Sequence, residues 1–380
     1  MIDWERRIQL AAHPVAYPLV RGISRLGPVV RVPRIGVVVS DAAIAREVLT
    51  DQTRFTKTGP GSPSDLWTPV LGPSVLLNME GAAHSLLREK LAPLFVPRYV
   101  NSLCAKVLTG PLDALACRLR AGSPVDLAAA VQQLAGAVIC ELVGLPPDPA
   151  RCAELFARGT ELTSMVRLGR PRLTPHQITR ARGALAVLTA PAAGAFRDGD
   201  TSTVPGTMRR LGLTEAEALG AVAAFVLTGT ETIVSYLPRL IALCHDTGWL
   251  DRLVADRSLS DTVIAEAFRV TVPTPVMLRS VALPGRVGSV AVRPGDRIVV
   301  ATISCARAYG PFNPDRPHPK ELRQLWFGAG PHFCLGMPLA KAEIDAVLGM
   351  ILDLGGVRVV SRRAARRVLI PGYQRLVVAR

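Results

Sequence analysis

Apolar residues recur at helical spacing through most of the chain between residues 80 and 270, and again over residues 335–354. This spacing places apolar side chains on one face of an α-helix, where they can be buried. The helices that it predicts are 82–95, 100–121, 127–145, 149–166, 175–197, 214–244, 260–270 and 335–354. The pattern therefore predicts a mainly helical chain.

Strand-like runs occur nearer the two ends of the chain. Residues 16–40, 281–302 and 365–380 are rich in Val and Ile and are interrupted by Gly and Pro, which is typical of strands joined by tight turns. The sequence Pro-Gly-Asp at 294–296 predicts one such turn. We therefore expect a mainly α fold with small β-sheets, an α+β arrangement. No linker or repeat divides residues 1–380, so we expect a single large domain.

The composition helps to exclude some classes of protein. The chain carries 45 Lys and Arg against 30 Asp and Glu, a net charge of +15. These basic residues are scattered, are almost all Arg and are not interleaved with aromatic residues, so a general bias toward Arg explains them better than nucleic-acid binding does. A basic face that attracts an acidic protein partner is compatible with the same charge.

The sequence predicts no membrane span, because no stretch of about 18 apolar residues is free of charges. Residues 1–20 mix charges and prolines with apolar residues, and they lack the basic-then-apolar layout of a signal peptide. We therefore expect a cytoplasmic protein.

Seven cysteines are spread over the chain without a Cys-x-x-Cys pair, and most lie among apolar neighbours, as buried reduced thiols do. Cys334 differs, because it lies in the run FGAGPHFCLG at 327–336, where glycines and a proline predict a tight non-helical loop. Helical spacing resumes directly afterwards, with Pro338 in the first turn, where proline is tolerated. We expect Cys334 at a helix N-terminus, where free amides and the helix dipole stabilise a thiolate.

Three other roles for Cys334 can be compared with a thiolate ligand. A zinc site needs several Cys or His ligands at fixed spacing, and only His332 is near in sequence. A nucleophilic cysteine needs a histidine and an orienting group elsewhere in the chain, which the sequence leaves open. A structural cysteine is the most common role for a single Cys, but it does not explain the Phe, Gly and His residues around this one.

The run at 327–336 resembles the haem-thiolate loop of the cytochrome P450 superfamily, without a departure at its defining positions. In that family the cysteine is the axial ligand of the haem iron, and its electron push favours cleavage of the O–O bond. The resemblance assigns this role to Cys334, with heme b as cofactor, and places Phe327 and Gly328 against the haem. It extends from about residue 80 to residue 380, and the strand-like N-terminal region is consistent with it.

Glu266 and Arg269 lie three residues apart, on one face of a predicted helix where a salt bridge can form. Many exposed helices carry such pairs, so the pair alone is weak. Its place upstream of the Cys loop resembles the Glu-x-x-Arg motif of the family, which an Arg from a later loop completes. Arg316 matches that Arg, although Pro317 follows it where the family usually has an aromatic residue. The resemblance makes all three residues structural.

The apolar segment 221–237 is interrupted by polar residues at 228–232. A core helix with threonines bonded back to its own carbonyls is one interpretation, but a Gly and an acid inside an apolar helix both cost stability. The segment resembles the oxygen-activating helix of the family. By this match Thr232 hydrogen-bonds oxygen at the iron, Glu231 belongs to the proton-delivery path, and Gly229 leaves room over the haem. Thr228 replaces a usual Ala, and Pro238 is expected to kink or end the helix.

His84 and Arg88 lie four residues apart, so they point to the same side of a helix. A solvated surface pair is the common alternative. The order His-x-x-x-Arg resembles the propionate-binding helix of the family. By this resemblance His84, Arg88, Arg279 and His332 bind the two haem propionates, which suits the chemistry of carboxylates among cationic and donor groups.

The resemblance implies a monooxygenase of the soluble bacterial type, which activates O2 and most simply hydroxylates an apolar terpenoid, steroid or polyketide in natural-product metabolism. Because the chain contains no flavin, ferredoxin or nicotinamide segment, we expect a separate ferredoxin and ferredoxin reductase to supply electrons to a monomer. The substrate is expected beside residues 56–76, 160–170, 224–232, 272–277 and 372–373. Desaturation, ring coupling, peroxide-driven oxidation and a non-catalytic haem sensor remain open, although a sensor has no need of Glu231 and Thr232.

Overall fold

The computed structural model describes residues 3–166 and 172–380, and it is mainly helical, as predicted. Its α-helices are α1 (Trp4–Ala12), α2 (Ala16–Ile23), α3 (Ala42–Thr50), α4 (Pro63–Leu71), α5 (Gly81–Leu91), α6 (Pro97–Arg120), α7 (Leu127–Leu142), α8 (Pro149–Ser164), α9 (Pro175–Asp198), α10 (Val204–Arg210), α11 (Glu215–Asp246), α12 (Trp249–Ala255), α13 (Ser260–Thr271), α14 (Thr302–Arg307) and α15 (Met337–Asp353).

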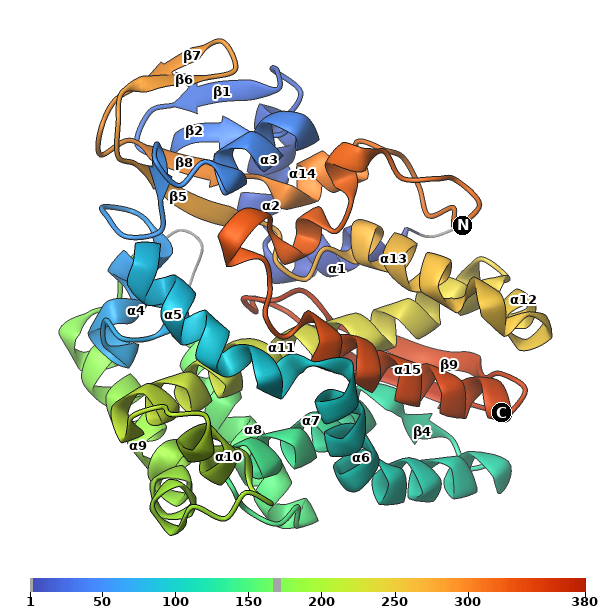
Figure 1. The fold of residues 1–380 in the computed structure, drawn as a ribbon. Coiled ribbons are helices and arrows are strands. Elements are labelled where there is room, and N and C mark those ends of the chain that lie inside the picture. Colours follow the sequence, from blue (N-terminus) through green and yellow to red (C-terminus); the bar gives the residue numbers. More distant parts are fainter. Residues whose placement is uncertain (1–2, 167–171) are drawn as a thin grey trace.

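The strands form small sheets at the edges of the helical body (Figure 1). They are β1 (Val29–Val32), β2 (Gly36–Val39), β3 (Phe55–Thr56), β4 (Val125–Asp126), β5 (Met277–Val281), β6 (Gly285–Val287), β7 (Val290–Val292), β8 (Arg297–Val300), β9 (Arg358–Ala364) and β10 (Tyr373–Ala379). A five-stranded sheet has the order β1-β2-β8-β5-β3, a three-stranded sheet has the order β4-β10-β9, and β6 pairs with β7. The pairs are antiparallel except β2 with β8.

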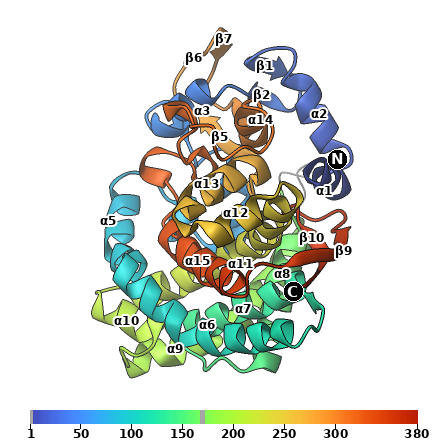
Figure 2. The ribbon, with the colours of Figure 1, turned by 90° about the vertical axis from the view of Figure 1, so that its right-hand side faces the viewer.

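Helix α11 runs through the middle of the molecule, with α15 beside it and α6 to α10 on the side away from the five-stranded sheet (Figures 1 and 2). It contacts α7, α8, α9, α13 and α15. By length and composition alone, α11 is long and apolar enough to cross a membrane. Most of its apolar window is nevertheless buried against the rest of the protein, which is the environment of a core helix.

Several boundaries differ from the prediction. Residues 16–23 form α2 and not a strand; the amide of Tyr17 donates to the carbonyl of His13, and that of Leu19 to the carbonyl of Val15. Within the strand-like run predicted at 365–380, the strand β10 begins only at Tyr373. Helix α11 continues through Pro238 to Asp246, two residues beyond the predicted helix at 214–244. Short apolar segments do not distinguish helix from strand by periodicity alone, and packing decides between them.

A buried ionic cluster on α13 supports the Cys loop. Two nitrogens of Arg269 donate to the Glu266 carboxylate at 2.6 Å, and both side chains are almost fully buried. Arg269 also donates to the carbonyl of Ala306. Between these two residues, Phe268 packs its ring 4.8 Å from that of Phe327, the first residue of the loop. The cluster therefore fixes the surface on which the loop rests.

Arg316 contributes less to this cluster than the sequence predicted. Its guanidinium lies 3.8 Å from Glu266 and donates instead to the carbonyl of Pro311 at 2.7 Å. His318 lies closer, with its Nε2 2.7 Å from Glu266 Oε2, and the amide of Asn313 donates to the other oxygen. Arg316 therefore pairs with Glu266 as predicted, and His318 is an additional and nearer partner.

Candidate functional site

The Cys loop is closed by its own backbone. The amide of Cys334 donates to the carbonyl of Phe327 at 2.9 Å, and that of Phe333 to the carbonyl of Gly330 at 2.9 Å. Gly328 and Gly330 have φ values of +84° and +66°, a region that strains residues with a side chain. A Cβ at Gly330 would also lie 3.1 Å from the Cα of Thr50. The glycines are therefore required by the geometry of the loop.

Helix α15 begins at Met337, three residues after Cys334, with Pro338 in its first turn. The sulfur of Cys334 accepts hydrogen bonds from the amides of Gly336 and Met337. Burial raises the pKa of the thiol, while these amides and the charges of Arg88 and Lys57 oppose the rise. The residue is nevertheless accessible. The geometry confirms the expected cysteine at a helix start, with donors and cations that favour a thiolate.

The four residues predicted to bind propionates converge from three segments. The rings of His84 and His332 lie 4.3 Å apart, which brings α5 against the Cys loop. Burial, followed by the charges of His332, Lys57 and Arg88, lowers the pKa of His84 to about 4. Arg279, on β5, is 5 % exposed, and burial lowers its pKa to about 10. The structure therefore brings these groups together beside Cys334.

Sequence reasoning missed two members of this cluster, Lys57 and Glu80. Burial, together with the nearby charge of Arg279, lowers the pKa of Lys57 to about 7. The carboxylate of Glu80 accepts hydrogen bonds from Thr56 and from the amide of Lys57, and it lies 3.5 Å from Nε2 of His332. The pairing of β3 with β5 brings residues 55 and 56 beside 281 and 280, and no sequence signal predicts it.

This cluster fits a ligand with two carboxylates. Among the described residues it combines three cationic side chains with one carboxylate, that of Glu80. The hydrogen bond that Arg279 makes runs to the carbonyl of Leu278 at 2.8 Å, and Nδ1 of the buried His332 ring has no partner within the described chain. Buried cations of this kind require anions. The donor set and an accessible cysteine sulfur therefore suit haem with its two propionates.

The predicted oxygen-side residues lie on α11. Thr228 and Gly229 are accessible although α11 is the central helix, and a Cβ added at Gly229 would meet no atom within 4 Å. The hydroxyl of Thr232 donates to the carbonyls of Thr228 at 3.2 Å and Gly229 at 3.3 Å. Glu231 points instead to α8, where Thr160 donates to its Oε1 at 2.7 Å. Glu231 and Thr232 are thus neighbours in sequence that face different partners.

The alternatives to a thiolate ligand find little support. Within residues 3–166 and 172–380, no group of three or more His, Cys, Asp or Glu side chains is arranged to hold a bare metal ion. The charged groups that act on the sulfur of Cys334 are Arg88 and Lys57, while the nearby rings of His84 and His332 contact each other, and His332 contacts Glu80. A zinc site requires several such ligands, and a His-activated nucleophile requires a histidine paired with the sulfur.

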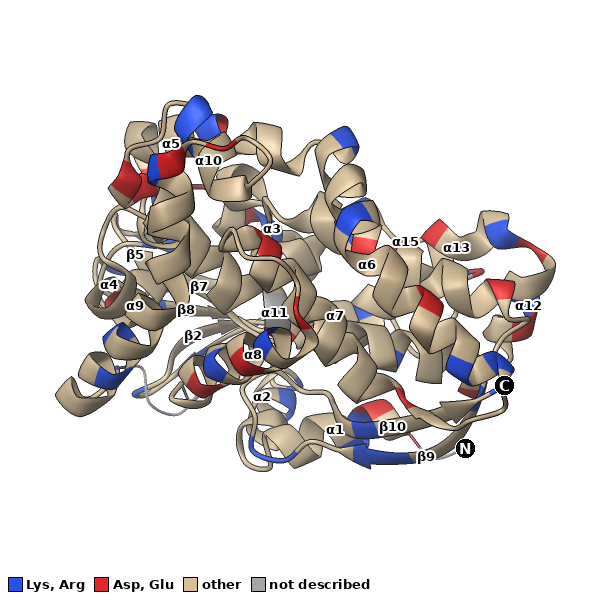
Figure 3. Cartoon of the chain, turned by 90° about the horizontal axis from the view of Figure 1, so that it is seen from below, with Lys and Arg blue, Asp and Glu red and all other residues tan. Residues whose placement is uncertain are grey.

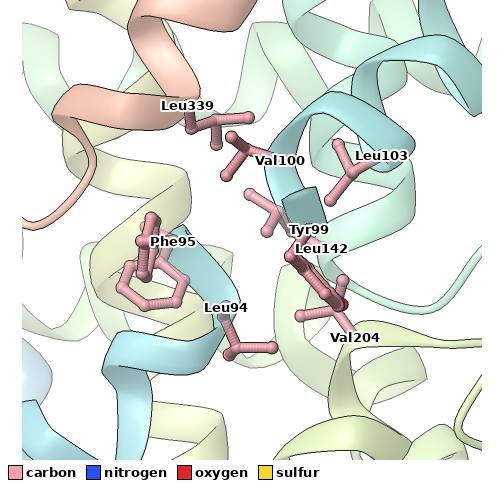
Figure 4. A pocket seen from close by; sticks show the side chains of 9 residues that line it. Leu94, Phe95, Tyr99, Val100, Leu103, Leu142, Val204 and Leu339 are labelled. Carbon is pink, nitrogen blue, oxygen red and sulfur yellow. The ribbon is translucent and has the colours of Figure 1, made fainter. Parts of the chain in front are cut away.

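A small apolar pocket lies between α6, α11 and the start of α15 (Figure 4). Phe95 and Phe225 meet edge to face at its wall, with ring centroids 5.1 Å apart. Its only titratable side chain is that of Tyr99. This pocket therefore belongs to the packing behind the Cys loop and offers no reacting groups.

Basic and acidic residues are mixed over the helices in the view of Figure 3, and they do not gather on a single element there. Many of them pair, for example Arg158 with Glu154 on α8 and Arg257 with Asp353. Exposed pairs of this kind contribute little to stability. The distribution of charged residues in the structure therefore agrees with the scattered basic residues of the sequence.

Residues 167–170 of the expected substrate lining lie outside the described residues.

A family model and similar known proteins point to the same family. The family model described as Cytochrome P450 matches residues 252–360, which include Glu266 and Cys334. Cytochrome P-450 monooxygenase DoxA of Streptomyces sp. (strain C5) is 30 % identical over 374 residues, covering 86 % of this chain and 84 % of DoxA. The 20-oxo-5-O-mycaminosyltylactone 23-monooxygenase of Streptomyces fradiae is 27 % identical and covers 73 % of this chain and 66 % of its own.

Solved structures agree in fold. A mutant of P450 EryK in complex with erythromycin B superposes with a TM-score of 0.81 at 22 % identity, covering 97 % of both chains. CYP109B1 from Bacillus subtilis superposes with a TM-score of 0.76 at 21 % identity, covering 97 % of this chain and 100 % of that one. The chain therefore belongs to the cytochrome P450 family, and it is a monooxygenase whose cofactor is a haem with a cysteine-ligated iron.

Proposed function

We propose that this protein uses a haem held by Cys334 to oxidise an apolar small molecule in natural-product metabolism, most simply by hydroxylation. One observation carries the proposal. The amides of Gly336 and Met337 support the sulfur of Cys334, the cations of Arg88 and Lys57 act on it, and the buried cation of Arg279 lies near Lys57. This combination matches an anionic ligand at the iron together with anionic propionates.

The haem supplies the oxygen and electron chemistry when bound, and the protein supplies orientation, protons and exclusion of water. His84, Arg88, Arg279 and His332 would hold the propionates of the haem, and Phe327 and Gly328 would lie beside its ring. Glu80 keeps His332 in place through the contact at 3.5 Å. Gly229 leaves the open space that the ring and the substrate need.

Glu231 and Thr232 deliver protons at the oxygen side. Burial raises the pKa of Glu231, against the opposing hydrogen bonds from Thr160 and Thr163, so the carboxyl keeps its proton to a higher pH than an exposed glutamate does. A carboxyl of this kind is a suitable proton donor near neutral pH. The hydroxyl of Thr232, one residue further along α11, can accept and pass on that proton when its bonds to the helix carbonyls open.

The relatives point to the class of substrate. One is named as acting on a mycaminosyltylactone, and a structural neighbour contains erythromycin B. Residues 56–76, 160–166, 224–232, 272–277 and 372–373 are mostly apolar or hydroxylated, which suits a large apolar natural product such as a polyketide, terpenoid or steroid. We propose that a separate ferredoxin and its reductase supply electrons in the cytoplasm.

The test of the oxygen-side assignment compares Glu231→Gln and Thr232→Ala with the parent enzyme. We expect each substitution to lower the rate of product formation by about 10²-fold, at the low end for general acid catalysis because water can partly replace the lost group. The measurements are the rate of product formation and the product formed per electron consumed, with a substrate found by screening macrolides, steroids and terpenes for a spin-state shift.

Thr247→Val is the matched control, because Thr247 caps the far end of α11 and its hydroxyl donates only to a helix carbonyl. It should leave the yield of product per electron unchanged. Unaltered yields in both Glu231→Gln and Thr232→Ala would show that these residues do not deliver protons.

A further inference from the structure

The carboxyl of Glu231 is held by threonines of α8. Thr160 donates to Oε1 at 2.7 Å, and the hydroxyl of Thr163 lies beside the same carboxyl and lowers its pKa. Thr163 also donates to the carbonyl of Thr160 at 3.0 Å. The two threonines lie three residues apart, so they share one face of the helix. Two hydroxyls from a neighbouring helix therefore set the direction of this acid.

Helix α8 is anchored at its start and meets α11 near its end. The side chain of Asp148 caps the helix by accepting from the amide of Arg151 at 3.0 Å. A Cβ at Gly136 of α7 would lie 2.5 Å from the carbonyl oxygen of Cys152, so the first half of α8 packs directly against α7. Thr160 and Thr163 lie in the last turns, within the stretch expected to line the substrate. The end of α8 that carries these threonines therefore meets α11 at Glu231.

The surroundings of Glu231 contain hydroxyls and not counter-ions. Burial and these two threonines are the influences that act on its pKa, and no charged side chain of the described residues is among them. The threonines lower the pKa and burial raises it, with burial the larger effect. Glu231 is therefore held by a hydrogen bond from a neutral hydroxyl and not by an ion pair. A single hydrogen bond of this kind contributes only modestly to stability, so it can break and re-form during turnover.

We propose that Thr160 is a positioning residue that holds the Glu231 carboxyl toward α8 and thereby controls when Glu231 is available as a proton donor. This inference rests on the proposed function of Glu231. In the described arrangement Glu231 bonds to Thr160 on α8, while Thr232 bonds to the carbonyls of Thr228 and Gly229. The bond to Thr160 therefore keeps the Glu231 carboxyl on a different partner from the hydroxyl of Thr232.

The test uses the haem-loaded enzyme with Thr160→Val and Thr160→Ser. Valine keeps the shape of threonine without its hydroxyl, whereas serine keeps the hydroxyl. Two quantities are measured: the titration of the Glu231 carboxyl by infrared difference spectroscopy against Glu231→Gln, and peroxide released without substrate. In Thr160→Val we expect the titration to move to higher pH, because a bond that lowers the pKa is lost, and peroxide release to rise severalfold. Thr160→Ser should restore both.

Thr189→Val on α9 is the control, because its hydroxyl donates only to the carbonyl of Leu185 in the same helix. It should change neither quantity. If Thr160→Val also changes neither quantity while Glu231→Gln lowers product formation, the positioning role is wrong and the proposed function stands. If Glu231→Gln leaves product formation intact, the proton-delivery role falls, and the inference falls with it.

Discussion

Cys334→Ala is expected to abolish the carbon monoxide difference band of thiolate-ligated haem in the reduced enzyme. The side chain provides the sulfur supported by the amides of Gly336 and Met337, and no other cysteine lies in the loop at 327–336. Its removal leaves the cations beside it without the charge of a thiolate. The measurement is the absorption spectrum of the reduced, carbon monoxide-treated protein after reconstitution with haem.

Cys117→Ser is the matched control for this prediction. Cys117 is an exposed free cysteine on α6, outside the Cys loop. The control should keep the band at full intensity. Circular dichroism shows whether each variant retains its helices. A thiolate band that survives in a folded Cys334→Ala protein means that another residue holds the iron.

Glu266→Ala is expected to reduce the free energy of unfolding by about 3–5 kcal/mol, the range found when one partner of a buried ion pair is removed. The guanidinium of Arg269 is fully buried, and it loses both hydrogen bonds to the carboxylate. The amide of Asn313 and the ring of His318 lose their acceptor at the same time. Denaturant unfolding followed by circular dichroism measures the change.

Two neighbouring substitutions separate the contributions to this cluster. Arg316→Ala should cost no more than about 1 kcal/mol, because the pair with Glu266 is 3.8 Å long and the arginine side chain is 31 % exposed. His318→Ala should cost about 1.5–3 kcal/mol, the range for a hydrogen bond to a charged group. A larger loss from Arg316→Ala than from His318→Ala would show that Arg316 contributes more to the cluster than His318 does.

The pH dependence of stability follows from the same carboxylate. Burial by itself raises the pKa of Glu266, but hydrogen bonds from Arg269, His318 and the amide of Asn313 outweigh it, so the pKa lies below the ordinary value of 4.5. The unfolded chain therefore binds a proton first as the pH falls. The contribution of Glu266 is fully present above about pH 4.5 and is lost as the pH falls through the folded-state pKa. Glu266→Ala should show a weaker loss of stability over that acid range, measured as the midpoint of unfolding against pH.

The sequence predicted most accurately the long helices whose apolar residues recur at helical spacing. The expected helix at 214–244 is α11, and that at 260–270 is α13, with boundaries displaced by one or two residues. These segments bury an apolar face against a large core, so their pattern carries the necessary information. Short segments such as α2 did not, because eight residues with little burial satisfy helix and strand patterns equally.

The residues of the candidate site also fall into those that the sequence predicted and those that it did not. Its loop residues, Cys334 and the glycines at 328 and 330, could be predicted because a tight turn before a helix requires particular residue types at adjacent positions. His84 and Arg88 could also be predicted as a pair on one helix face. Lys57, Glu80 and His318 could not, because they reach the site only through the pairing of β3 with β5 or the path of the loop after Pro311.

By itself, the sequence determined the helical body, the tight loop that presents Cys334 at the start of a helix, and, through its resemblance to a known family, the chemistry expected there. Constraints of this kind act between residues that are close in the chain, so the sequence alone reveals them. Only the tertiary structure decided which distant charges gather beside the sulfur, that His318 lies nearer Glu266 than Arg316 does, and that Thr160 holds Glu231. Those contacts join residues 50 or more positions apart, and their partners are selected by packing, which no local pattern records.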